Sequence, residues 1–244
     1  RIALLLFAPY FENGAYETLE RRLQTLRKRL GQVRDLDVLL EHMREYRSGL
    51  TEQGSEAFSP FLEEREIRRQ ERFEILLSYL DSKAFRKCIS SCRDFISEDN
   101  GGPGHSSWAD FRGRVEFVAP MLVLDRYFEV LAFAPLLPNA SLEQLHELRI
   151  RLKHLRYTIE FFGEILGESA IKTLKIITRT QDYLGELQDA QTATEILTPR
   201  LLDFDAEQSA RPVAHRYNPA PLLEYLARRQ ERKYELMQSF LPEW

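Results

Sequence analysis

Cysteine is scarce in this sequence, which contains two cysteines in 244 residues. Cys88 and Cys92 lie one helical turn apart, and two residues cannot supply the set of disulfides that stabilises small secreted domains. A closed zinc site takes four ligands, and His105 in the Gly-rich segment does not complete one with this pair. We therefore interpret the cysteines as two small, partly buried residues on one helix face in a reducing compartment.

Long hydrophobic runs are also missing. The run Ile2–Ala8 is short, and Val115–Pro138 is interrupted by Asp125, Arg126 and Glu129. A membrane-spanning helix requires about 20 consecutive apolar residues. The sequence therefore predicts no membrane span.

The first residues, RIALLLFA, resemble the apolar part of a short secretory signal. No small-residue cleavage signal follows them, and they have an internal counterpart described below. We therefore expect the chain to begin inside a helix whose first turns are missing, in a cytoplasmic protein.

Neither sign of charge dominates, since the formal net charge is −4. Bulk electrostatics thus give no reason to expect a nucleic-acid-binding protein, and an anion site must come from local sorting of charge. Such sorting is present. Six basic and two acidic residues occur in Tyr16–Arg34, whereas acidic residues gather in Glu63–Glu66 and Asp203–Glu207.

Alternation of apolar and polar residues with period two is almost absent, while the helical period runs through nearly the whole chain. The sequence predicts an all-α fold. The expected helices are Ile2–Phe11, Tyr16–Leu30, Arg34–Ser48, Pro60–Leu80, Ser82–Ser97, Arg114–Ala134, Leu142–Phe162, Ala170–Leu184, Leu187–Leu197 and Leu222–Phe240. Gly and Pro residues predict a break at Asn100–Ser107, and we expect loops around Gly49–Ser59 and Asp203–Ala220.

The two halves of the chain resemble each other. RYTIEFF at Arg156–Phe162 aligns with RIALLLF at Arg1–Phe7, and LGELQDA at Leu184–Ala190 aligns with LGQVRDL at Leu30–Leu36 at nearly the same offset. We predict two helical repeats, residues 1–99 and 108–244, related by a pseudo-twofold axis.

The shared LG-x-x-x-D pattern predicts a tight turn in each half. Glycine permits such a break, and the aspartate four residues later can cap the next helix or hold a neighbouring arginine. The predicted turn and cap residues are Gly31, Asp35, Gly185 and Asp189.

One predicted helix, Leu145–Phe162, carries two separate stripes. At about 100° per residue, its apolar residues share one face, with Ser141 as a plausible N-cap before it. Four potential hydrogen-bond donors lie on the adjacent flank: His146, Arg149, Lys153 and Arg156. Such a row suits an extended anion better than a single phosphate, although a solvated helix face is the simpler interpretation of the same pattern.

The stretches LHELRIRLKHLRYTIEFF, LGQVRDLDVLLEHM and LGELQDA resemble the CHAD family, the conserved histidine α-helical domain, over essentially the whole chain. The resemblance implies one CHAD-like domain, residues 1–244 and truncated at its N-terminus, built of two antiparallel four-helix bundles. It also implies a basic groove that binds inorganic polyphosphate, without known catalysis by the domain. On this basis we expect a cytoplasmic protein that can associate with polyphosphate granules.

The family's histidine motif falls on residues of the second half, and its first-half counterpart would lie before residue 1, leaving only Arg1. Residues carried over from the motif are His146, Arg149, Lys153, Arg156, Tyr157 and Arg1. Basic residues that share helix faces supply the expected second wall of the groove: Arg22, Arg29, Lys172, Lys175 and Arg179. We expect Arg151 and His154 to point away from this row, as solvated residues or partners of acids.

Several alternatives accompany this hypothesis. His146 could brace a helix contact, and Asp35, Asp37 and Asp189 could suggest a metal or an acid–base pair, although their motif context favours a structural role. The chain could instead be a structural or protein-interaction module. Binding of RNA would require aromatic residues interleaved with the basic ones, and only Tyr157 and Tyr183 qualify.

Hydrolysis of polyphosphate or triphosphate would require a metal site, for which the sequence offers no compact acidic set. We therefore predict a non-enzymatic protein without metal or cofactor. CHAD domains are often joined to triphosphatase domains, so the family resemblance also makes a triphosphatase or another polyphosphate-metabolising protein an expected partner.

Overall fold

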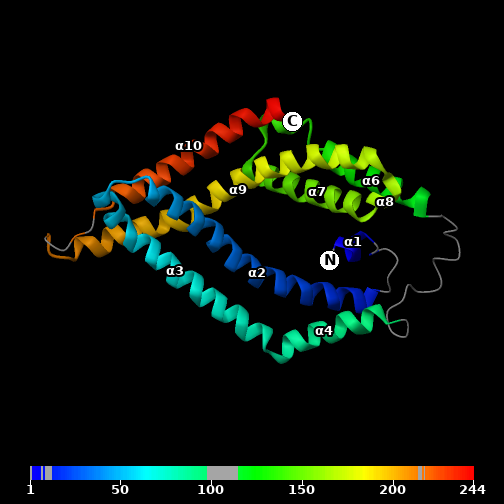
Figure 1. Ribbon diagram of the computed structural model, residues 1–244, viewed down its shortest axis with the longest axis horizontal. Helices are drawn as coiled ribbons and strands as arrows, with labels where there is room; N and C mark the ends of the chain where they lie inside the picture. The colour runs from blue at the N-terminus through cyan, green and yellow to red at the C-terminus, as the bar shows by residue number, and fades with distance from the viewer. Residues whose placement is uncertain (1, 7, 9–12, 98–114, 214–215, 217) are drawn as a thin grey trace. The chain divides into compact units, whose positions relative to one another are not determined.

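The computed structural model describes residues 2–6, 8, 13–97, 115–213, 216 and 218–244. Its helices are α1 (Ile2–Leu6), α2 (Asn13–Ser48), α3 (Glu52–Leu80), α4 (Lys83–Ile96), α6 (Val115–Leu131), α7 (Leu142–Phe161), α8 (Gly163–Leu166), α9 (Glu168–Ser209) and α10 (Ala220–Glu243), with a 3₁₀ turn at Leu137–Asn139 (Figure 1). No strand occurs within these described ranges. The predicted all-α fold is therefore confirmed.

The predicted breaks at the LG-x-x-x-D patterns are wrong. Gly31 lies inside α2 and Gly185 inside α9, and neither has a positive φ. A glycine destabilises a helix interior by about 1 kcal/mol relative to alanine. Burial on both sides of each glycine outweighs this penalty, with Leu19 and Val33 buried in α2 and Leu184 and Leu187 buried in α9.

Two predicted loops are also shorter than expected. Helix α3 begins at Glu52 and continues through Pro60, and α9 continues to Ser209. Phe58 and Phe204 are buried in the core of their unit, so the flanking turns remain helical. The predicted break at Asn100–Ser107 lies outside the described residues.

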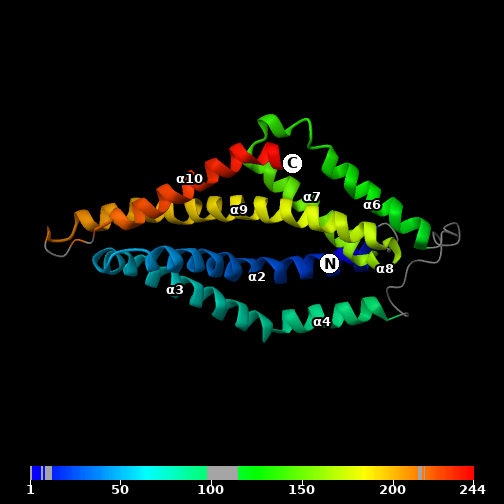
Figure 2. The same cartoon turned by 45° about the horizontal axis from the view of Figure 1, so that its top comes forward.

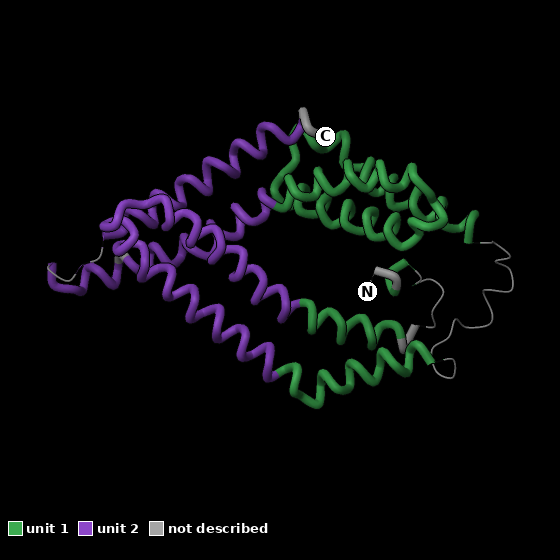
Figure 3. Tube along the Cα trace, in the orientation of Figure 1, with its two compact units in different colours: residues 1–27, 79–185, 243–244 green, residues 28–78, 186–242 purple. Residues whose placement is uncertain are grey.

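The chain forms two compact units. The first consists of residues 1–27, 79–185 and 243–244, and the second of residues 28–78 and 186–242 (Figure 3). Each unit draws on both halves of the sequence, and the boundary between them falls within α2 and within α9. The proposed pseudo-twofold repeat stays a prediction.

In the first unit, α1, α6 and α8 pack against α7, and Figure 2 shows α6 and α7 from a second direction. Leu6, Ala119 and Phe162 form a buried cluster with Leu122 and Leu166 at its edge. Gly167 ends α8 with a φ of 70°, a conformation that glycine adopts without a steric penalty. Here a glycine does end a helix.

The core of the second unit is formed by segments of four helices, α2, α3, α9 and α10. Its buried residues are Leu39, Leu40, Met43, Phe58, Phe61, Leu62, Ala193, Leu197, Phe204, Leu222 and Tyr225. Aromatic contacts are frequent, and the rings of Phe61 and Phe204 lie 4.8 Å apart between centroids. Burial raises the pKa of Tyr225 to about 12, so its hydroxyl stays protonated.

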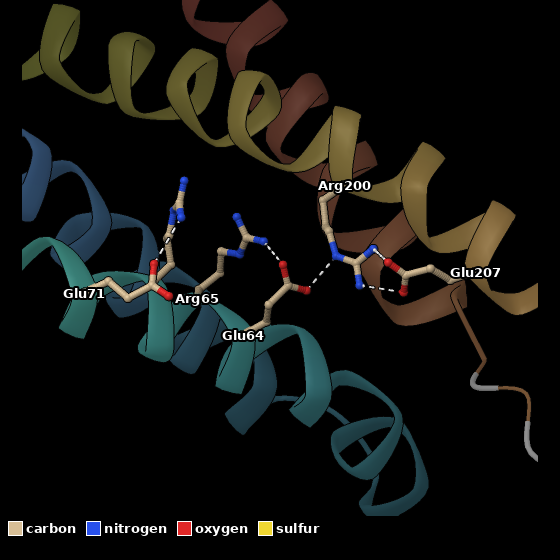
Figure 4. A network of polar contacts seen from close by, with 6 residues as sticks. Glu64, Arg65, Glu71, Arg200 and Glu207 are labelled. Atoms are coloured by element: carbon tan, nitrogen blue, oxygen red, sulfur yellow. Dashed lines mark hydrogen bonds and ion pairs between the residues drawn. The ribbon is translucent and has the colours of Figure 1, made fainter.

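An ion-pair network joins α3 to α9 within the second unit (Figure 4). Arg200 donates to Glu64 Oε2 at 2.6 Å and makes two further bonds of 3.1 Å to Glu207. Glu64 also accepts from Arg65. Although burial alone lowers the pKa of the Arg200 guanidinium, these hydrogen bonds raise it above its ordinary value. The charge of Arg200 is thereby matched within the protein.

Replacement of Arg200 by glutamine is predicted to lower the free energy of unfolding by about 1–2 kcal/mol, because charge-assisted hydrogen bonds to a partly buried group are lost. Arg200 is 19% exposed, whereas Arg68, which pairs only with Glu71, is 53% exposed. The matched change Arg68→Gln should alter stability by less than about 0.5 kcal/mol. Urea denaturation of both variants measures the difference, and equal losses would contradict it.

Candidate functional site

Helix α7 is positioned by local capping and by burial of one stripe. The Gln144 N–H donates to Ser141 Oγ at 3.2 Å, and the Ser141 N–H donates to Gln144 Oε1 at 2.8 Å, so a capping box begins the helix at Leu142. The predicted apolar stripe is confirmed, since its members are all 5% exposed or less: Leu145, Leu148, Leu152, Leu155, Ile159 and Phe162. The rotation of α7 therefore places the basic row on the flank of a buried face.

Arg149 lies on that flank, partly buried against α9. A Cβ built on Gly185 would lie 3.8 Å from both Nε and Nη2 of Arg149, so the guanidinium rests beside the backbone of α9 at that glycine. Arg149 Nε is buried and has no hydrogen-bond partner among the described residues. Its positive charge is thus partly removed from water without a matching carboxylate in the described part of the chain.

Farther along the same flank, two cations surround one aromatic ring. The Arg156 guanidinium lies 4.8 Å from the centre of the Tyr157 ring, and Lys153 Nζ lies 5.8 Å from it. Lys153 is exposed, whereas the side chain of Arg156 is 24% exposed and pairs with Glu160 at 3.4 Å. Cation–π contacts of this kind restrain long side chains without neutralising them.

His146 is exposed at the N-terminal end of the row. On α7 it lies one helical turn after Leu142 and one turn before Ile150, and this position fits the predicted row. Its role in binding a ligand or in bracing a helix contact stays a prediction.

Arg151 provides the contrast on the same helix. It donates to Glu147 on α7 at 2.7 Å and to Glu129 on α6 at 3.3 Å. The prediction that Arg151 is a partner of acids is therefore confirmed. Two arginines only two residues apart on α7 thus differ sharply in their surroundings.

The first part of α9 contributes further basic residues to the same unit. Lys172, Lys175 and Arg179 are all exposed and follow one face of the helix. Asp182, also exposed, lies three residues after Arg179 and reduces the net charge at that end. The positive stretch of α9 therefore runs from Lys172 to Arg179, between Glu168 and Asp182.

Arg22 makes hydrogen bonds to helix α4. Its Nη1 donates to the backbone oxygen of Lys87 at 2.9 Å and to Ser91 Oγ, so Arg22 contacts α4. Arg29 is partly buried and belongs to the second unit, and Arg1 lies outside the described residues. The place of these three residues in a binding site stays a prediction.

The predicted turn and cap residues do not have those roles. Gly31 and Asp35 lie within α2, and Gly185 and Asp189 within α9, where no helix begins. Asp37, considered above as a metal ligand, accepts a hydrogen bond from Arg69 Nε at 2.8 Å. The contact of Gly185 with Arg149 was not predicted, because it depends on how α7 packs beside α9.

Arginines of the second unit are largely matched by acids. Their pairs, with nitrogen–oxygen distances of 2.6 to 2.8 Å, are Arg44–Glu66, Arg69–Asp37, Arg200–Glu64 and Arg232–Glu186. The hydrogen bond from Arg232 is the main cause that lowers the pKa of Glu186. Arg229 is an exception in this unit, because its Nε and Nη2 are buried and have no hydrogen-bond partner among the described residues. What distinguishes Arg149 is its contact with the backbone of α9 at Gly185.

The two cysteines are free thiols on α4, with Cys88 buried and Cys92 partly buried. Burial raises the pKa of the Cys88 thiol, and the neighbouring Cys92 adds to that increase. Within the described ranges, no group of three or more His, Cys, Asp or Glu side chains could hold a metal ion.

The site is a row of basic side chains along one helix of an all-α protein. A family model described as CHAD domain matches residues 1–198. The chain therefore belongs to the CHAD family. No curated protein matches it. None of the described helices is long and apolar enough to cross a membrane.

Under the expectation that the basic row of α7 binds a polyanion, replacement of Glu160 by glutamine is predicted to raise the affinity for added polyphosphate about two- to fivefold, because Arg156 loses its competing carboxylate. Glu164→Gln removes the same charge from α8 and serves as the control, with a smaller effect expected. Fluorescence anisotropy with labelled polyphosphate measures both variants. Identical affinities for the two variants would remove Arg156 from the site.

Proposed function

We propose that this protein binds inorganic polyphosphate along the basic row of α7. The single observation that carries the proposal is the partly buried guanidinium of Arg149, whose Nε has no partner among the described residues while the flanking Arg151 is matched by two carboxylates. A charge kept away from acids inside a protein with a net charge of −4 favours an external anion.

The side chains in the row suit a linear polyanion. Arginine donates in a planar fork to neighbouring oxygens, lysine supplies a mobile point charge, and histidine donates in either protonation state. His146, Arg149, Lys153 and Arg156 extend over about ten residues of helix, or roughly 15 Å at 1.5 Å per residue. Several phosphate units can therefore contact the row at once, and each contact adds to the affinity.

Further basic residues extend the proposed site. Lys172, Lys175 and Arg179 belong to the same unit as α7, and all three are exposed. We propose them as weaker, electrostatic contacts that act chiefly by releasing counterions from the ligand. The complete groove between two repeats, with Arg22, Arg29 and Arg1 in its walls, is part of the same hypothesis.

The decisive experiment compares variants that lose the same number of positive charges at different positions. Arg149→Gln, Lys153→Gln and Arg156→Gln together should weaken polyphosphate binding at least about a hundredfold, since each charge-assisted contact contributes about 1–3 kcal/mol. The dependence of affinity on salt should become shallower as well. Titration calorimetry at several salt concentrations measures both quantities.

Two controls accompany this variant. The charge-matched triple Arg44→Gln, Arg68→Gln and Arg228→Gln changes exposed, acid-paired arginines of the second unit and should bind nearly as the unchanged protein does. Arg149→Gln and Arg151→Gln remove one charge each from α7, and only the first should weaken binding. Equal losses in the two triples, with melting temperatures unchanged, would show that binding follows overall charge.

We further propose that binding proceeds without catalysis, and that the protein holds polyphosphate in the cytoplasm or delivers it to a triphosphatase or another polyphosphate-metabolising partner. Incubation of the purified protein with long-chain polyphosphate and divalent cations should leave the chain length unchanged on a gel and release no orthophosphate. Shortening of the chains that requires Arg149 or Lys153 would overturn this part of the proposal.

A further inference from the structure

The backbone conformation at position 185 does not require glycine. It lies within the regular helix α9, and its φ is not positive. In a helix interior glycine is less stable than alanine, so helix propensity alone disfavours it. An explanation must therefore come from the space that its missing side chain leaves.

That space is bordered by the guanidinium of Arg149. A methyl group at Gly185 would lie 3.8 Å from both Nε and Nη2 of Arg149, an ordinary van der Waals distance. Alanine would therefore fit without displacing the guanidinium. Any larger side chain directed the same way would enter the volume that the guanidinium occupies, because protein interiors leave few voids.

The contact holds Arg149 in one place without neutralising it. Its Nε is buried and has no hydrogen-bond partner among the described residues. A charge with a reduced hydration shell attracts an incoming anion more strongly than a fully solvated one, and a fixed orientation lowers the entropy lost on binding. Both effects depend on the guanidinium lying against the backbone of α9.

Gly31 supplies an internal comparison. It occupies the same place in the LG-x-x-x-D pattern and also lies within a long helix, α2. A Cβ at Gly31 would meet no atom within 4 Å apart from its own surroundings in the helix. The two glycines therefore share a motif and a backbone conformation but differ in what adjoins them.

We propose that Gly185 is a positioning residue for polyphosphate binding, and that the absence of any side chain larger than a methyl group at this position lets the guanidinium of Arg149 lie against α9 in an anion-ready orientation. The inference rests on the proposed function, because it assigns Gly185 a role in that same site. It acts through Arg149 alone, and Gly31 has no corresponding role.

The test is a graded series at both glycines. Gly185→Ala should keep the polyphosphate affinity within about twofold and raise the melting temperature, whereas Gly185→Leu should weaken binding about tenfold, approaching Arg149→Gln. Gly31→Ala and Gly31→Leu should leave binding unchanged. Undiminished binding by a folded Gly185→Leu variant would overturn the inference.

A double-mutant cycle separates positioning from a general structural effect. Gly185→Leu should add no further loss when Arg149 is already glutamine, because the group through which it acts is gone. Equal losses in both backgrounds would contradict positioning. Failure of the proposed function gives a different result, in which the unchanged protein does not bind polyphosphate or Arg149→Gln binds as well as it does.

A measurement that does not involve binding keeps the inference testable when Gly185→Leu does not fold. The Nε–H proton of Arg149, observed by NMR in the unchanged protein, should exchange slowly with solvent, and in Gly185→Ser, a smaller replacement, it should exchange at least about tenfold faster. Rapid exchange in the unchanged protein, or identical rates in the two proteins, would overturn the seating of Arg149.

Discussion

Burial of one stripe of α7 determines where every charge on that helix lies. Six apolar side chains of the stripe are 5% exposed or less, and together they fix the rotation of the helix about its axis. A rotation by one residue would move the row by about 100° and would bury lysine or arginine in place of leucine. The arrangement of the candidate site is thus a consequence of hydrophobic packing.

The protein separates two uses of arginine. In the second unit, Arg200 and Arg232 lie between carboxylates and connect neighbouring helices. Arg149 instead lies against a glycine backbone with its Nε buried. Matched pairs lower the free energy of the folded protein modestly. An unmatched, partly desolvated charge raises that free energy, and a bound anion would offset the increase. Arginine content alone therefore says little about anion binding.

Local signals were predicted well. Ser141 and Gln144, three residues apart, form the cap at which α7 starts, and the spacing of leucines gives the buried face of the helix. The helix start and the buried face were therefore both predictable from the sequence. The assignment of Gly31 and Gly185 to turns was wrong because the outcome depends on burial of residues before and after each glycine, supplied by other helices. Propensity is outweighed there by tertiary packing.

The candidate site was only partly predicted, because some of its contacts also depend on tertiary packing. Membership of the row on α7 follows from helical spacing, but the pairing of Arg156 with Glu160 and the contact of Arg22 with α4 depend on side-chain conformation and on packing of distant segments. Nothing in the local sequence around Gly185 indicates that Arg149, 36 positions earlier, is its neighbour. Only the packed helices bring the two together.

The bond from Arg22 to α4 has an evolutionary consequence. One acceptor is the main-chain oxygen of residue 87, which every amino acid possesses, so the lysine there can be exchanged without removing the bond. The donor has no such freedom, because a guanidinium is needed to reach that oxygen and the Ser91 hydroxyl from one nitrogen. Selection on this contact therefore acts on Arg22 and on Ser91, whereas the amino acid at position 87 can change without affecting it.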